Sequence, residues 1–172
     1  MRDPSPRDRL RAAFPLEGGS ELGTRMLHAS DVEKPLPDVP RMNWVEVADV
    51  IDRMPLDGLL HLEDADAAYY RPGLVLGFIE KPDAHPFLDV EDLFHDLPSY
   101  THGRDARFEG RWGALTPVQA AVLLDLLDAL ADGNRVSERT RDAAHELLEP
   151  LVVPKASRLP NEAPGQARGD SA

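Results

Sequence analysis

The chain has 172 residues and a formal net charge of −12, with 31 acidic residues against 19 lysine and arginine residues. It contains no cysteine, which excludes disulfides, a thiol nucleophile and thiolate metal sites. The acidic excess repels phosphate backbones and anionic lipids, so we expect no nucleic-acid partner and no membrane binding. Because no long apolar run or signal-peptide pattern occurs, we expect a cytoplasmic, bacterial type of protein.

The first half of the chain contains three predicted helices, each opened by a capping residue. Helices are expected over residues 5–14, 43–54 and 64–70, with Ser5, Asn43 and Asp64 as N-caps. Residues 15–42 form a proline- and glycine-rich connection, and a short apolar run at 59–62 fits either a strand or a helical turn. Pro72-Gly73 predicts a helix kink or break before a buried apolar run at 74–79.

The second half of the chain contains three further helices. Asp89 caps a helix over 90–97 that Pro98 ends, and Ser137 caps a helix to about residue 149. Between them, Thr116-Pro117-Val118-Gln119 forms a capping box ahead of a leucine-rich helix to residue 131, which Gly133-Asn134 ends with a left-handed residue. Val118 belongs to the apolar side of that helix by its position on the helical wheel.

The predicted architecture is all-α. It is an irregular multi-helix bundle in which the leucine-rich helix of the C-terminal half is the central element. Residues 5–153 form one globular domain, since a single core serves a chain of this length. Residues 154–172 contain one leucine and no aromatic residue, so we expect a disordered tail.

Candidate chemical groups are few. Glu91 and His95 stand four residues apart on one predicted helix, which predicts a surface Glu–His pair, and no HExxH, EF-hand, Walker A or Gly-x-Ser-x-Gly pattern occurs. The carboxylate pair of Asp64 and Asp66 is explained by helix capping and solvation. We therefore assign no catalytic residue, no metal ligand and no cofactor.

Aromatic and arginine residues supply the one candidate binding site. Tyr69, Tyr70 and Arg71 precede the proline, and Arg111 and Trp112 precede the leucine-rich helix. These residue types dominate the energetics of protein interfaces, because they combine large contact area with planar hydrogen bonding. They also fit packing at the edge of a core, which is the competing interpretation.

The order of these motifs resembles a family of small uncharacterised bacterial proteins. The family shares an Ala-Tyr-Tyr-x-Pro helix break, here residues 68–72, and a Leu-Thr-x-x-Gln helix start, here residues 115–119. The resemblance spans residues 9–131 and implies a mostly helical fold, but it transfers no activity and no catalytic residue. Arg71 stands where the family more often has an aliphatic residue.

Three functions remain open at this point. The favoured one is a non-enzymatic, immunity-type or accessory protein whose acidic segment binds a basic protein partner. That segment, residues 55–98, holds ten acidic residues against Arg71 and Lys81, although a solvated acidic surface explains it too. The alternatives are a small metal-dependent hydrolase assembled from distant histidines and carboxylates, and a structural subunit of a homo-oligomer.

Overall fold

The computed structural model describes residues 3–17, 42–53, 64–84, 89–101, 103 and 106–152. Within these ranges the chain forms helices and no strand, which confirms the all-α prediction. The run at 59–62, residues 18–41 of the predicted connection 15–42, and the predicted tail at 154–172 lie outside the described ranges. Among the described helices, none is both long and apolar enough to cross a membrane.

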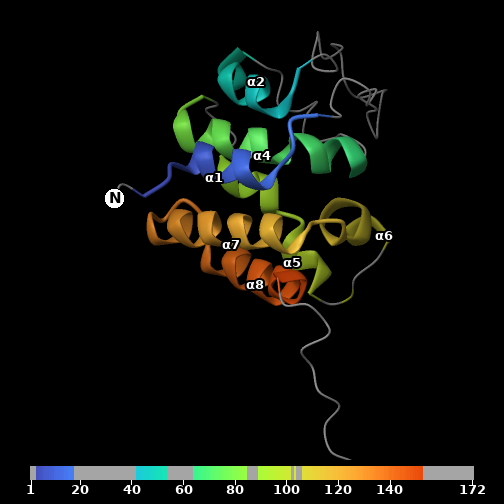
Figure 1. The fold of residues 1–172 in the computed structure, drawn as a ribbon. Coiled ribbons are helices and arrows are strands. Elements are labelled where there is room, and N and C mark those ends of the chain that lie inside the picture. The colour runs from blue at the N-terminus through green and yellow to red at the C-terminus, as the bar shows by residue number, and fades with distance from the viewer. Residues whose placement is uncertain are drawn as a thin grey trace, which may run out of the picture.

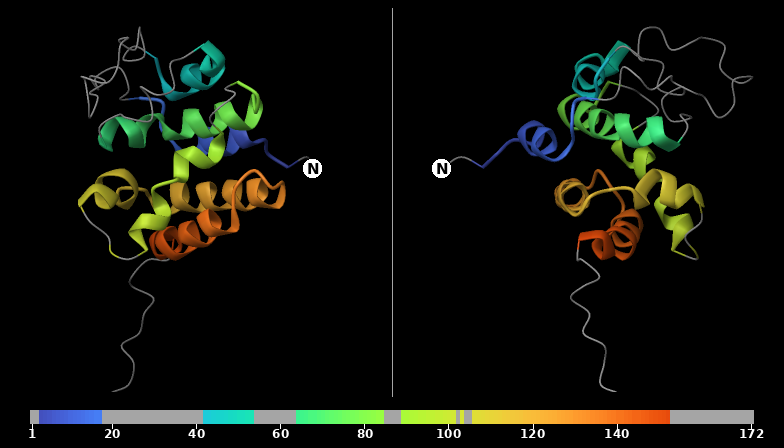
Figure 2. Two further views of the ribbon diagram at one scale, coloured as in Figure 1. Left: turned by 180° about the vertical axis from the view of Figure 1, so that it is seen from behind. Right: turned by 45° about the vertical axis from the view of Figure 1, so that its right-hand side comes forward.

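The helices stack in layers (Figures 1 and 2). At one end α2 (Trp44–Asp49) packs on α4 (Asp64–Glu80), and α1 (Pro6–Ala13) lies between α4 and α7 (Pro117–Asp132). Below α7 lies α8 (Glu138–Val152), the outermost layer at the other end. The short helices between α4 and α7 close one side of this stack, so the core runs continuously through all layers.

Capping residues set most of the helix starts as the sequence predicts, but the predicted cap Asp64 is itself the first residue of α4 and pairs with Arg111. Each cap is a reciprocal capping box, in which a polar side chain accepts from the backbone N–H three residues on, and that residue's side chain accepts from the cap's N–H. The structure forms such boxes at Ser5, Asn43, Asp89 and Thr116. Ser137 also accepts from the Thr140 N–H at the start of α8.

Two predicted helices are shorter than the sequence indicates. The helix from Asn43 ends at Asp49, and a single 3₁₀ turn η2 (Ile51–Arg53) follows. The segment after Asp89 is the 3₁₀ helix η3 (Val90–Phe94), followed by α5 (Leu97–Tyr100). Pro98 therefore lies in the first turn of α5 instead of ending a helix, a position where its missing N–H costs nothing.

Of the kink or break predicted at Pro72-Gly73, the break does not occur. Helix α4 continues through both residues, and every position from Tyr70 to Phe78 is buried. A Cβ on Gly73 would lie 2.0 Å from the Trp44 carbonyl oxygen, so α2 crosses α4 with its backbone against this glycine. Burial of this segment on all sides offsets the roughly 3 kcal/mol that an internal proline costs a helix.

The leucine-rich helix α7 buries one broad side and exposes the other. Its buried residues are Ala120, Leu123, Leu124, Leu126, Leu127 and Leu130. Val118 is an exception to the prediction: it lies in the first turn and is 61% exposed. The left-handed residue after the helix is Asn134, with φ of 56°, whereas Gly133 has φ of −84°. Asparagine tolerates this conformation better than other non-glycine residues.

Candidate functional site

The structure brings three of the five predicted site residues into contact. Arg71 comes from the middle of α4, and Arg111 and Trp112 come from the π-helical turn η4 (Glu109–Gly113), which follows α6 (Ala106–Phe108). The Arg71 guanidinium lies over the Trp112 ring, 3.6 Å from its centroid. Its Nη1 also donates to the Arg111 carbonyl oxygen at 2.5 Å. A cation over a buried indole is stabilised by about 2 kcal/mol.

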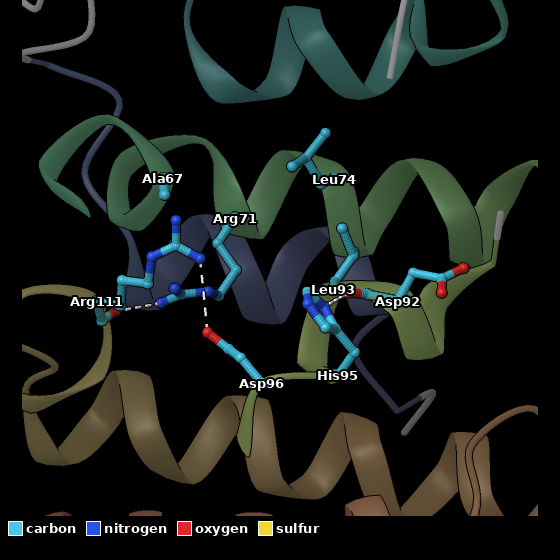
Figure 3. A pocket seen from close by; sticks show the side chains of 8 residues that line it. All are labelled: Ala67, Arg71, Leu74, Asp92, Leu93, His95, Asp96 and Arg111. Carbon is cyan, nitrogen blue, oxygen red and sulfur yellow. Dashed lines mark hydrogen bonds and ion pairs between the residues drawn. The ribbon is translucent and has the colours of Figure 1, made fainter. Parts of the chain in front are cut away.

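Two aspartates, Asp64 and Asp96, balance the charge of the two arginines; Figure 3 shows Asp96 beside both arginines. Arg111 Nε donates to Asp64 Oδ1 at 2.8 Å, and Arg111 Nη1 lies 3.5 Å from Asp96 Oδ2. We name Arg71, Arg111, Asp64 and Asp96 the arginine–aspartate cluster. Burial lowers the pKa of Arg71 to about 10, which leaves it cationic at neutral pH, and the negative charge of Asp96 opposes this shift. The cluster is therefore neutral as a whole.

A small cavity adjoins the arginine–aspartate cluster. Its volume is about 30 Å³, and Asp92, His95 and Asp96 line it together with the two arginines (Figure 3). Neither Asp96 oxygen receives a hydrogen bond from the described residues, although both are inaccessible to solvent. A volume of this size matches roughly one water molecule. The cavity can hydrate Asp96, but it cannot hold a substrate.

The two tyrosines anchor backbone segments. Tyr70 is fully buried and donates to the Met42 carbonyl oxygen at 3.3 Å, and burial raises the pKa of its phenol to about 12. Tyr69 is half-buried, meets Tyr70 edge to face and donates to the Leu16 carbonyl oxygen at 2.8 Å. Four of the five predicted residues are at most 7% exposed, all except Tyr69. That these five bind a partner stays a prediction.

Most of the described carboxylates of the acidic segment 55–98 make contacts within the domain. Asp64 and Asp96 face Arg111, and Glu80 binds Arg7 in a two-point ion pair. Asp89 and Asp92 form a capping box. These carboxylates have partners within the domain, so their presence in the segment is accounted for by the fold and does not require a binding partner.

Glu91 belongs to this set as well. It accepts hydrogen bonds from Ser137 Oγ, from the Ser137 N–H at 3.2 Å and from Thr140 Oγ1 at 2.8 Å. The Ser137 hydroxyl is the main cause of the lowered pKa of Glu91. His95 instead lies with Nδ1 2.5 Å from the Asp92 carbonyl oxygen. The pairing of Glu91 with His95 that the sequence spacing predicts is therefore wrong.

Sequence reasoning missed an exposed row of carboxylates on α8. We name it the α8 acidic face; it consists of Glu138, Asp142, Glu146 and Glu149, all exposed. At 100° per residue these four lie within about 80° of the helix circumference and extend over roughly 17 Å. The spacing of four, four and three residues in the sequence was the signal that could have found it. The opposite side of α8 buries Ala143, Ala144, Leu147 and Leu148.

His145 joins the α8 acidic face to α7. Its Nε2 lies 2.9 Å from Asp128 Oδ1 and its Nδ1 lies 2.7 Å from Glu149 Oε1. Its pKa is raised, first by the hydrogen bond with Asp128 and then by that with Glu149. The described ranges contain no group of three or more histidine and carboxylate residues that could hold a metal ion. Four of the six histidines lie outside those ranges, at positions 28, 61, 85 and 102.

Fold and site together define a mainly helical protein with an arginine–aspartate cluster whose two arginines are buried, and with an exposed acidic face on α8. Comparison with family models, with curated proteins and with solved structures gave no match. The family resemblance over residues 9–131 therefore stays a prediction.

Proposed function

We propose that this protein binds a basic protein partner through the α8 acidic face, as an immunity-type or accessory protein without catalysis of its own. The observation that carries the proposal is the row of exposed carboxylates on the outermost helix. Glu138 and Glu146 make no ion pair or hydrogen bond with any described residue, and the side chain of Asp142 is 75% exposed. Such carboxylates pair with lysine or arginine side chains of a partner without breaking contacts inside the domain.

Charge is the property that selects the partner. The chain carries a net charge of −12, so the molecule as a whole and the α8 acidic face both attract a basic surface. Two arginines reduce the negative charge of the α8 acidic face: Arg139 lies at its edge, and Arg141 Nε is 3.8 Å from Asp142 Oδ1. Contacts at an exposed rim govern the association rate and its dependence on salt more than the final affinity.

The experiment compares two variants that change charge equally. Glu138→Gln/Asp142→Asn/Glu146→Gln removes three charges from the α8 acidic face. The control removes three charges from exposed acids elsewhere that neither cap a helix nor pair with a described residue: Asp3→Asn/Glu17→Gln/Asp83→Asn. Tagged proteins are incubated with lysate of the source cell, and retained proteins are identified by mass spectrometry over a salt series.

We expect wild type and control to retain the same basic protein at low salt and to release it as salt rises. The α8 variant should lose it at every salt concentration. Equal retention by the α8 variant, or retention that is indifferent to salt, would refute the proposal. Circular dichroism of the three proteins checks that their helix content is equal.

A further inference from the structure

A second cavity, larger than the one beside Asp96, opens between three helices. It lies where the end of α1, the first half of α4 and the start of α7 meet, and its volume is about 160 Å³. Its lining is mainly apolar and includes Phe14, Pro15, Ala68, Tyr69, Ala114 and Leu115. An engineered apolar cavity of about 150 Å³ in another protein takes up benzene, so the space fits a single aromatic ring.

Two exposed apolar residues are neighbours in the chain of residues that line this cavity. Leu16 and Val118 are the exposed large hydrophobic residues of the described ranges, at 38% and 61%. Leu16 follows the lining residue Pro15, and Val118 precedes the lining residue Gln119. Exposed apolar groups beside a concave apolar space are typical of a binding site.

Polar groups at the wall restrict the kind of molecule that fits. Gln119 Oε1 accepts from the Thr116 N–H at 2.9 Å, so its amide nitrogen is the group left to donate. Arg111 also lines the cavity, but Asp64 and Asp96 balance its charge. A carboxylate ligand would therefore gain little from Arg111, whereas a neutral ligand avoids the cost of losing its water shell.

We propose that this cavity binds a small neutral molecule that consists of one aromatic ring with a hydrogen-bond acceptor. The ring packs between the side chains of Phe14 and Tyr69, and the acceptor takes a hydrogen bond from the Gln119 amide. This site is independent of the α8 acidic face, so either proposal can fail without the other.

The test titrates acetophenone into the full-length, ¹⁵N-labelled protein and follows amide shifts by NMR. Acetophenone has one ring, no charge and a carbonyl acceptor. We expect saturable shifts at Ala68 and Leu115, and binding about tenfold weaker for toluene, which lacks the acceptor. Benzoate should bind more weakly than acetophenone. The absence of saturable shifts with acetophenone, or tighter binding of benzoate, would overturn the proposal.

Two variants separate the cavity from nonspecific binding. Ala114→Trp fills the cavity from an exposed position, and Ala12→Trp on α1 is the exposed control. Gln119→Glu keeps an acceptor for the Thr116 N–H but removes the amide donor. We expect Ala114→Trp to abolish binding, Ala12→Trp to leave it unchanged, and Gln119→Glu to weaken acetophenone more than toluene. Undiminished acetophenone binding by Ala114→Trp or Gln119→Glu would refute the assignment.

Discussion

Replacing Arg71 by methionine tests whether the arginine–aspartate cluster holds α4 against η4. The substitution keeps an unbranched apolar stem in place of the arginine stem but removes the cation over Trp112, which is stabilised by about 2 kcal/mol. It also removes the charge-assisted hydrogen bond to the Arg111 carbonyl oxygen, roughly 1.5 to 3 kcal/mol. Relief of the cost of burying a charge offsets part of this loss. We expect Arg71→Met to lower the free energy of unfolding by about 3 kcal/mol.

The assay is equilibrium unfolding in guanidinium chloride, with and without Asp96→Asn. Asp96 receives no hydrogen bond from the described residues and depends on nearby positive charge. In the Arg71→Met background, Asp96→Asn should therefore cost less stability than it does in the wild type. Arg71→Lys, which keeps the charge, should lose less stability than Arg71→Met. Strict additivity of the two substitutions, or an Arg71→Met variant as stable as wild type, would refute the reasoning.

Two further predictions concern α4 and α8. Gly73→Ala should lower the free energy of unfolding by about 3 kcal/mol or more, because the new Cβ would lie 2.0 Å from the Trp44 carbonyl oxygen. The control is Gly133→Ala, whose Cβ would have no neighbour within 3.4 Å and which should change stability little. Equal midpoints of the two variants in urea unfolding would contradict this. His145→Gln should lower the melting temperature at pH 5.5 and have a smaller effect at pH 9. The pKa of His145 is raised in the folded state, so its contribution to stability is full below the unfolded pKa of 6.5 and is lost as pH rises through the folded pKa. An equal drop in melting temperature at both pH values would contradict the role of Asp128.

The helix starts could be predicted from sequence because capping is local. At Ser5, Asn43, Asp89 and Thr116 the cap and its partner lie within three residues of each other. Such hydrogen bonds depend on a short stretch of chain and little on the rest of the fold. The helix ends were predicted less well, since the end of α2 and the 3₁₀ form of η3 depend on how these segments pack on α4.

The errors arise where a distant segment decides the outcome. Pro72 predicts a break on local grounds, but the close crossing of α2 over Gly73 holds the helix together. Spacing along one helix likewise pairs Glu91 with His95. In the structure Glu91 instead binds Ser137 and Thr140, which lie 46 and 49 positions further along the chain. The sequence indicated that Arg71 and Arg111 belong together, but their burial and their aspartate partners follow from the tertiary arrangement alone.

The contact of Glu91 with the start of α8 has a consequence for how the molecule folds. Helix α8 takes part of its N-terminal hydrogen bonding from a carboxylate that lies far away in the chain. Loss of an interaction that is absent from the folding transition state speeds unfolding and leaves the folding rate nearly unchanged. We expect the Glu91 contact to be of this kind, so that loss of Glu91 shortens the lifetime of the native state by letting α8 detach sooner.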